Sequence, residues 1–159
     1  EMAIGRIGDD TTVNVGQIEG GRASNIVPDY CEVSGELRSF SHKKALEELA
    51  KVEQIFAKEA EKRGGSIEFI RDICYQAYKT DENESVVKEF QKACMACGIK
   101  SSLIATFGGS DQNKMSEHGI PGIVMASAMH QVHSCQEYTE VSEMAQVAGI
   151  VSELLQMKE

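Results

Sequence analysis

The first part of the chain alternates apolar and polar positions with the period of β-strands. In residues 12–19, TVNVGQIE, valines alternate with polar neighbours, which predicts a strand with one buried face. Two glycines end that segment. The same alternation returns over residues 28–40, where a second half-buried strand is predicted, with Pro28 at its start because a strand end tolerates the missing N–H.

An amphipathic helix is predicted after the second strand. Apolar side chains recur at three- and four-residue spacing from Leu46 to Ala60. Ser41 is placed to cap the start of this helix, and Gly64 to end it. Residues 66–75, SIEFIRDICY, carry several β-forming residues and are predicted as a third strand. Strands, a helix and a further strand indicate an α+β unit built on an antiparallel sheet.

The pattern changes near residue 80, where helices begin to alternate with short apolar strands. The predicted elements are helices over residues 82–98 and 142–157, buried strands over residues 101–107 and 120–127, and a small helix between those strands. Such alternation is typical of a parallel α/β layer. We therefore expect an α/β protein, with an α+β part in residues 1–80 and, in residues 81–159, an α/β segment of a larger parallel sheet.

Charge and composition narrow the possible partners. The chain has 25 acidic and 16 basic residues, a formal charge of -9, which argues against nucleic acid and anionic lipid as partners. Its longest apolar run, IPGIVMASAM, is far shorter than the ~20 residues that span a bilayer. The first ten residues lack the basic start and apolar core of a signal peptide, and the five cysteines are an odd number. We expect a cytoplasmic protein.

Two of the four histidines lie close together in the stretch MHQVHSCQEY. His130 and His133 are three residues apart, and Glu137 follows. A hydrolytic zinc centre needs about three protein ligands and an open position for water, so this stretch can supply only part of one. Cys94 and Cys97 form a CxxC pair, but both lie on the apolar stripe of a predicted helix and are interpreted as core residues.

Two loops are placed to meet at one edge of the predicted parallel sheet. The stretch Gly108–Asp111, GGSD, and the stretch around His133 each follow a buried strand, where ligands collect in open α/β sheets. Glycines let backbone N–H groups approach a substrate, although Gly, Ser and Asp are also ordinary turn and helix-cap residues. Earlier in the chain, Arg38 could pair with a substrate carboxylate, and Asn25 could donate to a carbonyl.

Two longer stretches resemble the M20 family of metallopeptidases. Residues 20–40, GGRASNIVPDYCEVSGELRSF, resemble its lid, or dimerisation, domain, with a glycine turn, an Asn-Ile-Val-Pro strand start and an arginine near the strand end. Residues 108–138, GGSDQNKMSEHGIPGIVMASAMHQVHSCQEY, look like the closing section of its catalytic domain. The resemblance extends over residues 4–157 and looks most like the peptidase T, or tripeptide aminopeptidase, branch.

The resemblance implies roles for five residues. By position, His133 matches the family's last metal ligand, Arg38 the lid arginine that binds the substrate carboxylate, and Asn25 the lid asparagine near the scissile carbonyl. Gly109 and Ser110 match the loop that contacts the substrate backbone. Such enzymes use two zinc ions bridged by a carboxylate and a water, with a separate Glu as general base.

The family's other metal ligands and its catalytic Glu have no match in the chain. The resemblance therefore implies a C-terminal fragment of a longer dizinc exopeptidase, inactive by itself. Residues 1–80 would be a lid that forms homodimers, with its first strand and helix largely missing, and residues 81–159 the end of the catalytic domain. The opening EMAIGRIGDD is interpreted as the end of the lid's first helix. Two alternatives stay open: an M20 amidohydrolase of N-acyl amino acids, and a non-catalytic dimerisation or binding module.

Overall fold

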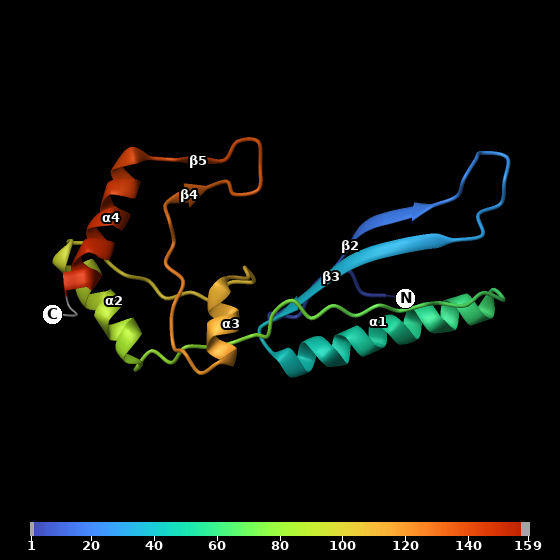
Figure 1. Ribbon diagram of the computed structural model, residues 1–159, viewed down its shortest axis with the longest axis horizontal. Coiled ribbons are helices and arrows are strands. Elements are labelled where there is room, and N and C mark those ends of the chain that lie inside the picture. Colours follow the sequence, from blue (N-terminus) through green and yellow to red (C-terminus); the bar gives the residue numbers. More distant parts are fainter. Residues whose placement is uncertain (1, 157–159) are drawn as a thin grey trace. The chain divides into compact units, whose positions relative to one another are not determined.

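The chain divides between Tyr78 and Lys79 into two units, each with its own helices and strands (Figure 1). The computed structural model describes residues 2–156. Within that range there are four helices and five strands, and every strand pair is antiparallel. The mixed α/β class and the antiparallel sheet predicted from the sequence are confirmed.

Three antiparallel strands form the sheet of the first unit. In sheet order they are β1 (Gly5–Ile7), β2 (Thr11–Gly20) and β3 (Cys31–Ser39). β2 and β3 confirm the two strands predicted from alternation. β1 shows that the interpretation of the opening residues as a helix end is wrong. Gly5 pairs with Val13, because the chain turns back onto β2 near Gly8, whose φ of 61° suits glycine.

The register of β2 and β3 distributes their side chains between two faces of the sheet. Val13, 4% exposed, lies opposite Leu37 on the buried face. Asn14 and Glu36 lie opposite each other on the other face, which Arg38 shares because residues 36 and 38 have the same parity along β3. One face of the sheet therefore forms a small core, and the other presents polar groups.

Helix α1 (His42–Lys62) follows β3 and packs against it. The Ser41 hydroxyl accepts a hydrogen bond of 3.4 Å from the backbone N–H of Lys44, which caps the start of the helix. Just beyond the end, Gly64 has a φ of 73°, the left-handed conformation that commonly ends helices. The predicted helix and both of its end signals are confirmed.

The third predicted strand, over residues 66–75, is wrong. These residues form neither helix nor strand and run back along α1 (Figure 1). A strand needs a hydrogen-bonded neighbour, and no described strand pairs with this segment. Arg71 makes an ion pair with Glu53 of α1, and Ile70 is 82% exposed. The residues of this segment favour β-structure, but within residues 2–156 no neighbouring strand is present for them to pair with.

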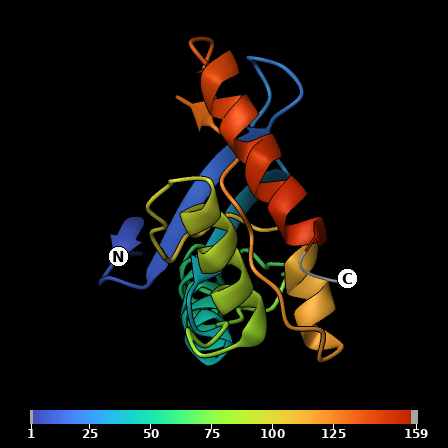
Figure 2. The same cartoon turned by 90° about the vertical axis from the view of Figure 1, so that its left-hand side faces the viewer.

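The regular elements in the described part of the second unit are three helices and one short hairpin. They are α2 (Ser85–Ala96), α3 (Asp111–Glu117), β4 (Met129–His130), β5 (Tyr138–Thr139) and α4 (Val141–Gln156). The three helices agree with the predicted ones, apart from Met157, which lies outside the described residues. α2 and α4 lie against each other in both views (Figures 1 and 2).

A small core holds α2 and α4 together. Ala93, Cys94 and Ile150 are each at most 6% exposed, and Cys97 packs against them. Burial raises the pKa of the Cys94 thiol, and the neighbouring Cys97 adds to that effect. A thiol with a raised pKa is a poor nucleophile and a poor metal ligand. The interpretation of the CxxC pair as core residues is confirmed.

The parallel strands predicted over residues 101–107 and 120–127 are not formed. Both segments are irregular, and β4 and β5 are the paired strands of this unit within residues 79–156. Ile104 and Val124, which a parallel sheet would bury, are mostly exposed. A parallel strand forms only beside another strand, and the described residues supply none. The Thr80 hydroxyl donates a 2.6 Å hydrogen bond to the Gly122 carbonyl and so fastens the second segment.

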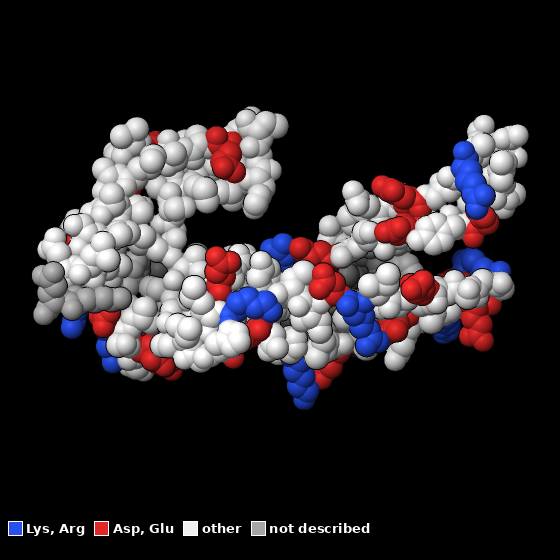
Figure 3. Space-filling view, in the orientation of Figure 1, with Lys and Arg blue, Asp and Glu red and all other residues white. Residues whose placement is uncertain are grey.

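Charged side chains of both signs are interspersed on the visible face of the first unit (Figure 3). On the face drawn in Figure 3, Lys and Arg alternate with Asp and Glu across the first unit. Several of these charges are paired: Lys44 with Asp10, Lys51 with Glu48, and Arg63 with Glu59. Among the helices of residues 2–156, none combines the length and the apolar character needed to cross a bilayer.

Candidate functional site

His133 lies in a tight loop that joins β4 to β5. The His133 backbone N–H donates to a Glu137 carboxylate oxygen at 2.9 Å, and the Ser134 hydroxyl donates to the Gln131 carbonyl at 2.7 Å. Gln131 and His133 have φ values of 51° and 65°, which side-chain-bearing residues rarely adopt. The loop leaves His133 exposed to solvent. Its geometry depends on Glu137, the acid that the sequence placed four residues after the histidine.

His130 has different partners from those of His133. Its Nε2 lies 2.6 Å from a carboxylate oxygen of Glu143, in the first turn of α4. Its ring stacks on Tyr138, with ring centroids 4.8 Å apart and an angle of 15° between the planes. The sequence suggested no role for Glu143, because thirteen positions separate it from His130 and no motif joins them. The Tyr138 contact follows from the pairing of these two residues across the hairpin.

The described residues do not form a metal site. Within residues 2–156 no group of three or more His, Cys, Asp or Glu side chains could hold a metal ion. His133 offers one exposed imidazole, and His130 is engaged by Glu143. One donor falls short of the three protein ligands of a hydrolytic zinc centre, so no catalytic step through a metal can be derived from these residues alone.

The GGSD stretch lies at the start of α3. The Ser110 backbone N–H donates to the Asn113 side-chain oxygen at 2.9 Å, and Asn113 is buried. The Gly108 N–H donates to the Thr106 hydroxyl at 3.2 Å, and Gly109 is exposed. Ser110 thus serves as a helix cap, one of the two interpretations left open by the sequence. The substrate contact predicted for Gly109 and Ser110 stays a prediction.

Arg38 lies near the end of β3 and is held by its neighbour Glu36. The Arg38 Nε and Nη2 atoms each donate to a Glu36 carboxylate oxygen at 2.7 Å. The Arg38 hydrogen bonds hold the pKa of Glu36 below its usual range, and Glu36 raises the pKa of Arg38. The pairing displays the two-pronged, charge-assisted geometry proposed for a substrate carboxylate. No role for Glu36 was predicted, although its place two residues before Arg38 puts both side chains on one face of the strand.

Asn25 lies far from Arg38 within the first unit. Asn25 belongs to the exposed loop between β2 and β3, next to the Gly20–Cys31 end of the ladder, and an ion pair of 2.6 Å between Arg22 and Asp29 ties that loop together. Arg38 lies seven residues along β3 from Cys31, a separation of roughly 23 Å at 3.3 Å per residue. One chain therefore does not bring these two predicted substrate-binding residues together in the first unit.

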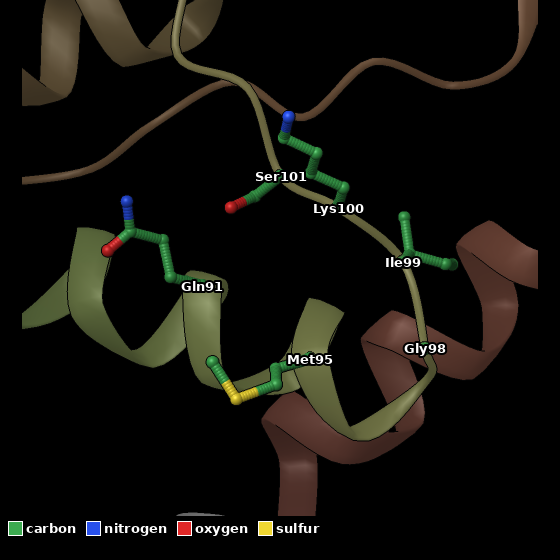
Figure 4. A pocket seen from close by; sticks show the side chains of 6 residues that line it. All are labelled: Gln91, Met95, Gly98, Ile99, Lys100 and Ser101. Atoms are coloured by element: carbon green, nitrogen blue, oxygen red, sulfur yellow. The ribbon is translucent and has the colours of Figure 1, made fainter.

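A shallow hollow of about 420 Å³ lies beside the end of α2 (Figure 4). Its lining side chains are Gln91, Met95, Ile99, Lys100 and Ser101, with the backbone of Gly98. No carboxylate or imidazole is among them, and none is a predicted site residue. The hollow is therefore not a candidate for acid–base or metal chemistry.

The first unit matches a known protein family. The family description "Peptidase dimerisation domain", of the M20 peptidases, matches residues 3–64. Residues 3–64 form an M20 dimerisation domain. This match covers the whole β1–β2–β3–α1 unit described above.

Similarity to known proteins extends beyond the dimerisation domain. The uncharacterized protein YqjE of Bacillus subtilis strain 168 is 32% identical over 156 residues, which are 98% of this chain and 42% of YqjE. The crystal structure of the aminopeptidase PepT from Bacillus cereus is 32% identical, with a TM-score of 0.84. That of a tripeptidase from Staphylococcus aureus is 28% identical, with a TM-score of 0.90. Each structure matches 98% of this chain, which spans 42% of their chains.

A more distant structure shares the fold alone. The Bacillus subtilis YXEP protein, described as a dinuclear metal binding peptidase from the M20 family, is 18% identical, with a TM-score of 0.70 over 91% of this chain. Both units of this chain therefore have counterparts in these solved structures, although the chain spans less than half the length of these proteins.

Proposed function

We propose that this chain is part of a metallo-exopeptidase of the M20 family that hydrolyses short peptides. The observation that carries the proposal is the match of 98% of the chain, across both units, to an aminopeptidase and a tripeptidase at TM-scores of 0.84 and 0.90. A match to the dimerisation domain alone would say little about catalysis. The match extends through the loop that carries His133, where the family's last metal ligand is expected.

The proposal gives each predicted residue a role. His133 supplies one ligand of a two-zinc centre, Arg38 binds the substrate's terminal carboxylate, and Asn25 donates to the scissile carbonyl. Gly109 and Ser110 contact the substrate backbone. The bound metal would activate the attacking water. The remaining ligands and the general-base Glu must come from outside the described residues, because residues 2–156 hold no metal cluster. The chain by itself is therefore inactive.

The dimerisation domain is proposed to form a homodimer. β1 and β3 are the edges of the sheet, and β3 offers nine residues where β1 offers three. An exposed strand edge can add a strand from another molecule through backbone hydrogen bonds. We infer that the outer edge of β3, with α1 beside it, meets the same surface of a second copy. The separation of Asn25 and Arg38 fits such an assembly, since two copies could each supply one residue to a site.

We propose a cytoplasmic location. Cys31, Cys74 and Cys135 are exposed and unpaired, as thiols are in reducing compartments. The chain carries a formal charge of -9, and a net negative charge disfavours the binding of nucleic acid and of anionic membranes.

The test is performed on the whole protein. Its zinc content and its hydrolysis of a tripeptide are compared with those of the His133→Ala variant, and the 159-residue chain is assayed beside them. The proposal expects bound zinc, tripeptide hydrolysis, losses of both in the variant, and no turnover by the chain alone. Hydrolysis of N-acyl amino acids in place of tripeptides would favour an amidohydrolase, and a metal-free, inactive whole protein would overturn the proposal.

A further inference from the structure

We propose that His130 is a positioning residue, which together with Glu143 fixes the His133 loop to helix α4. The inference rests on the proposed function, in which His133 acts at the site. His130 itself would bind neither metal nor substrate.

The β4–β5 hairpin is too short to hold its own orientation. Each strand has two residues, with Met129 opposite Thr139 and His130 opposite Tyr138. An isolated two-stranded hairpin is marginally stable at best in water, even with longer strands. Contacts outside the hairpin must therefore determine where the loop points.

Inside the loop, hydrogen bonds tie residues 131–137 to one another. Besides the His133–Glu137 bond, the Gln136 N–H donates to the Ser134 hydroxyl at 3.1 Å, and the Glu137 N–H donates to the Ser134 carbonyl at 3.2 Å. These bonds offset the strain of the left-handed φ values at Gln131 and His133. They give the loop a defined internal shape, but they do not fix it to the rest of the unit.

The His130–Glu143 contact supplies that anchor. A carboxylate only accepts hydrogen bonds, so the Nε2 of His130 donates to Glu143 across 2.6 Å. Tyr138 stacks on the same ring and limits its rotation. Glu143 stands in the first turn of α4, and α4 is held in the core by Ile150, which is 6% exposed. Besides the short chain connection from β5 through Glu140, this side-chain hydrogen bond joins the loop to the start of α4.

The experiment uses the whole protein with four substitutions. Glu143→Ala removes the acceptor and His130→Phe keeps a ring on Tyr138 but removes the donor. Glu143→Gln keeps an acceptor and is the conservative rescue. Glu140→Ala, which removes an exposed carboxylate at the same end of α4, is the matched control for charge. Amide hydrogen exchange of residues 131–139 and of α4 is measured for each, together with kcat and KM for the tripeptide.

Glu143→Ala and His130→Phe are each expected to lose about tenfold protection in residues 131–139, with α4 unchanged. Their kcat should fall about tenfold with KM within about twofold, because a displaced loop misplaces His133 without removing substrate contacts. Glu143→Gln and Glu140→Ala should resemble the unsubstituted protein. Unchanged loop protection in both disruptive variants would overturn the inference, as would equal effects of Glu140→Ala.

The two proposals fail in different ways. If the whole protein hydrolyses no peptide, the proposed function fails, while hydrogen exchange still decides whether His130 and Glu143 hold the loop. If His130→Phe abolishes zinc binding as His133→Ala does, while Glu143→Ala leaves it intact, His130 is a ligand and the positioning role is wrong. If Glu143→Ala disturbs α4 as a whole, the hydrogen exchange of His130→Phe decides the question, because residue 130 lies outside that helix.

Discussion

The Arg38 guanidinium and the Glu36 carboxylate are joined by two parallel hydrogen bonds of 2.7 Å each. Both residues lie on the polar face of β3, and both side chains are about half exposed. An exposed ion pair contributes little stability, because water and salt compete with it. The pair keeps the guanidinium oriented, and under the proposed function a substrate carboxylate would compete with Glu36 for the Arg38 Nε and Nη2 donors.

Glu36→Gln is therefore expected to tighten the binding of peptides with a free terminal carboxylate to the whole protein. The expected gain is about threefold in KM, the scale of one exposed ion pair. Peptides with an amidated terminus provide the control, and their KM should not change. A weaker or unchanged KM for the free acid would show that Glu36 does not compete for Arg38.

The Asp10–Lys44 ion pair makes stability depend on pH in the acidic range. The hydrogen bond from Lys44 is the largest cause of the lowered pKa of Asp10. A group with a lowered folded-state pKa stabilises the fold above its ordinary pKa, near ~4, and that contribution is lost as pH falls through the lowered value. The stability difference between the chain and Lys44→Met should thus be largest at neutral pH and shrink below about pH 4.

Urea unfolding between pH 2 and pH 7 measures this difference. Lys43→Met is the matched control, since the Lys43 ammonium lies 3.9 Å from Glu47 and both side chains are largely exposed. Its effect should be small at every pH. A difference for Lys44→Met that grows on acidification would contradict the assignment of the pair to Asp10.

Gly35 in β3 is required by the close approach of β2. A Cβ at Gly35 would lie 2.6 Å from the Asn14 carbonyl oxygen, a distance that real Cβ atoms do not adopt. Gly35→Ala should therefore destabilise the chain by about 1–3 kcal/mol, because the strands must separate locally. At Gly16, on the neighbouring strand, a Cβ would meet its nearest atom at 3.8 Å. Gly16→Ala should cost much less, and equal costs by urea unfolding would refute the explanation.

Ile150 is the main aliphatic contribution of α4 to the core of the second unit. Truncation by Ile150→Ala should cost about 2–4 kcal/mol, through lost burial and the cavity that remains. Leu155, on the same helix, is 67% exposed, and Leu155→Ala should change stability by less than about 0.5 kcal/mol. The midpoint of urea unfolding compares the two variants. Similar losses would mean that α4 is held mainly by another face.

Helices and the hairpin of long strands were predictable because their signals are local. Ser41, Gly64 and the apolar stripe between them specify α1 within one continuous segment. The strand predictions failed at residues 66–75, 101–107 and 120–127, where the β-forming residues were present but the partner strand was not. The short strand Gly5–Ile7 was not predicted, for the opposite reason. Its residues have weak β-propensity, and the strand forms because it pairs with β2.

The features of the candidate site also divide into those that could be predicted from the sequence and those that could not. The spacing of His133 and Glu137 was recognised in the sequence, and in the structure a hydrogen bond joins these two residues. Glu143 was not identified as the partner of His130, because that contact depends on how the hairpin and α4 lie in space. Glu36 was overlooked as the partner of Arg38, although its position two residues earlier on the same strand is a local signal. The separation of Asn25 and Arg38 follows from the ladder, since Arg38 lies roughly 23 Å along β3 from Cys31, at the end where the Asn25 loop begins.

The sequence by itself determined the four described helices and the two long strands of the first unit, since cap residues and apolar periodicity are local signals, and it also carries the stretches that resemble M20 peptidases. Tertiary structure alone decided which apolar segments became strands, which carboxylate engages His130, and that one imidazole makes no metal centre within residues 2–156. The physical reason is that strand ladders, ion pairs and metal clusters need partners brought together from distant positions, and local propensity does not specify those partners.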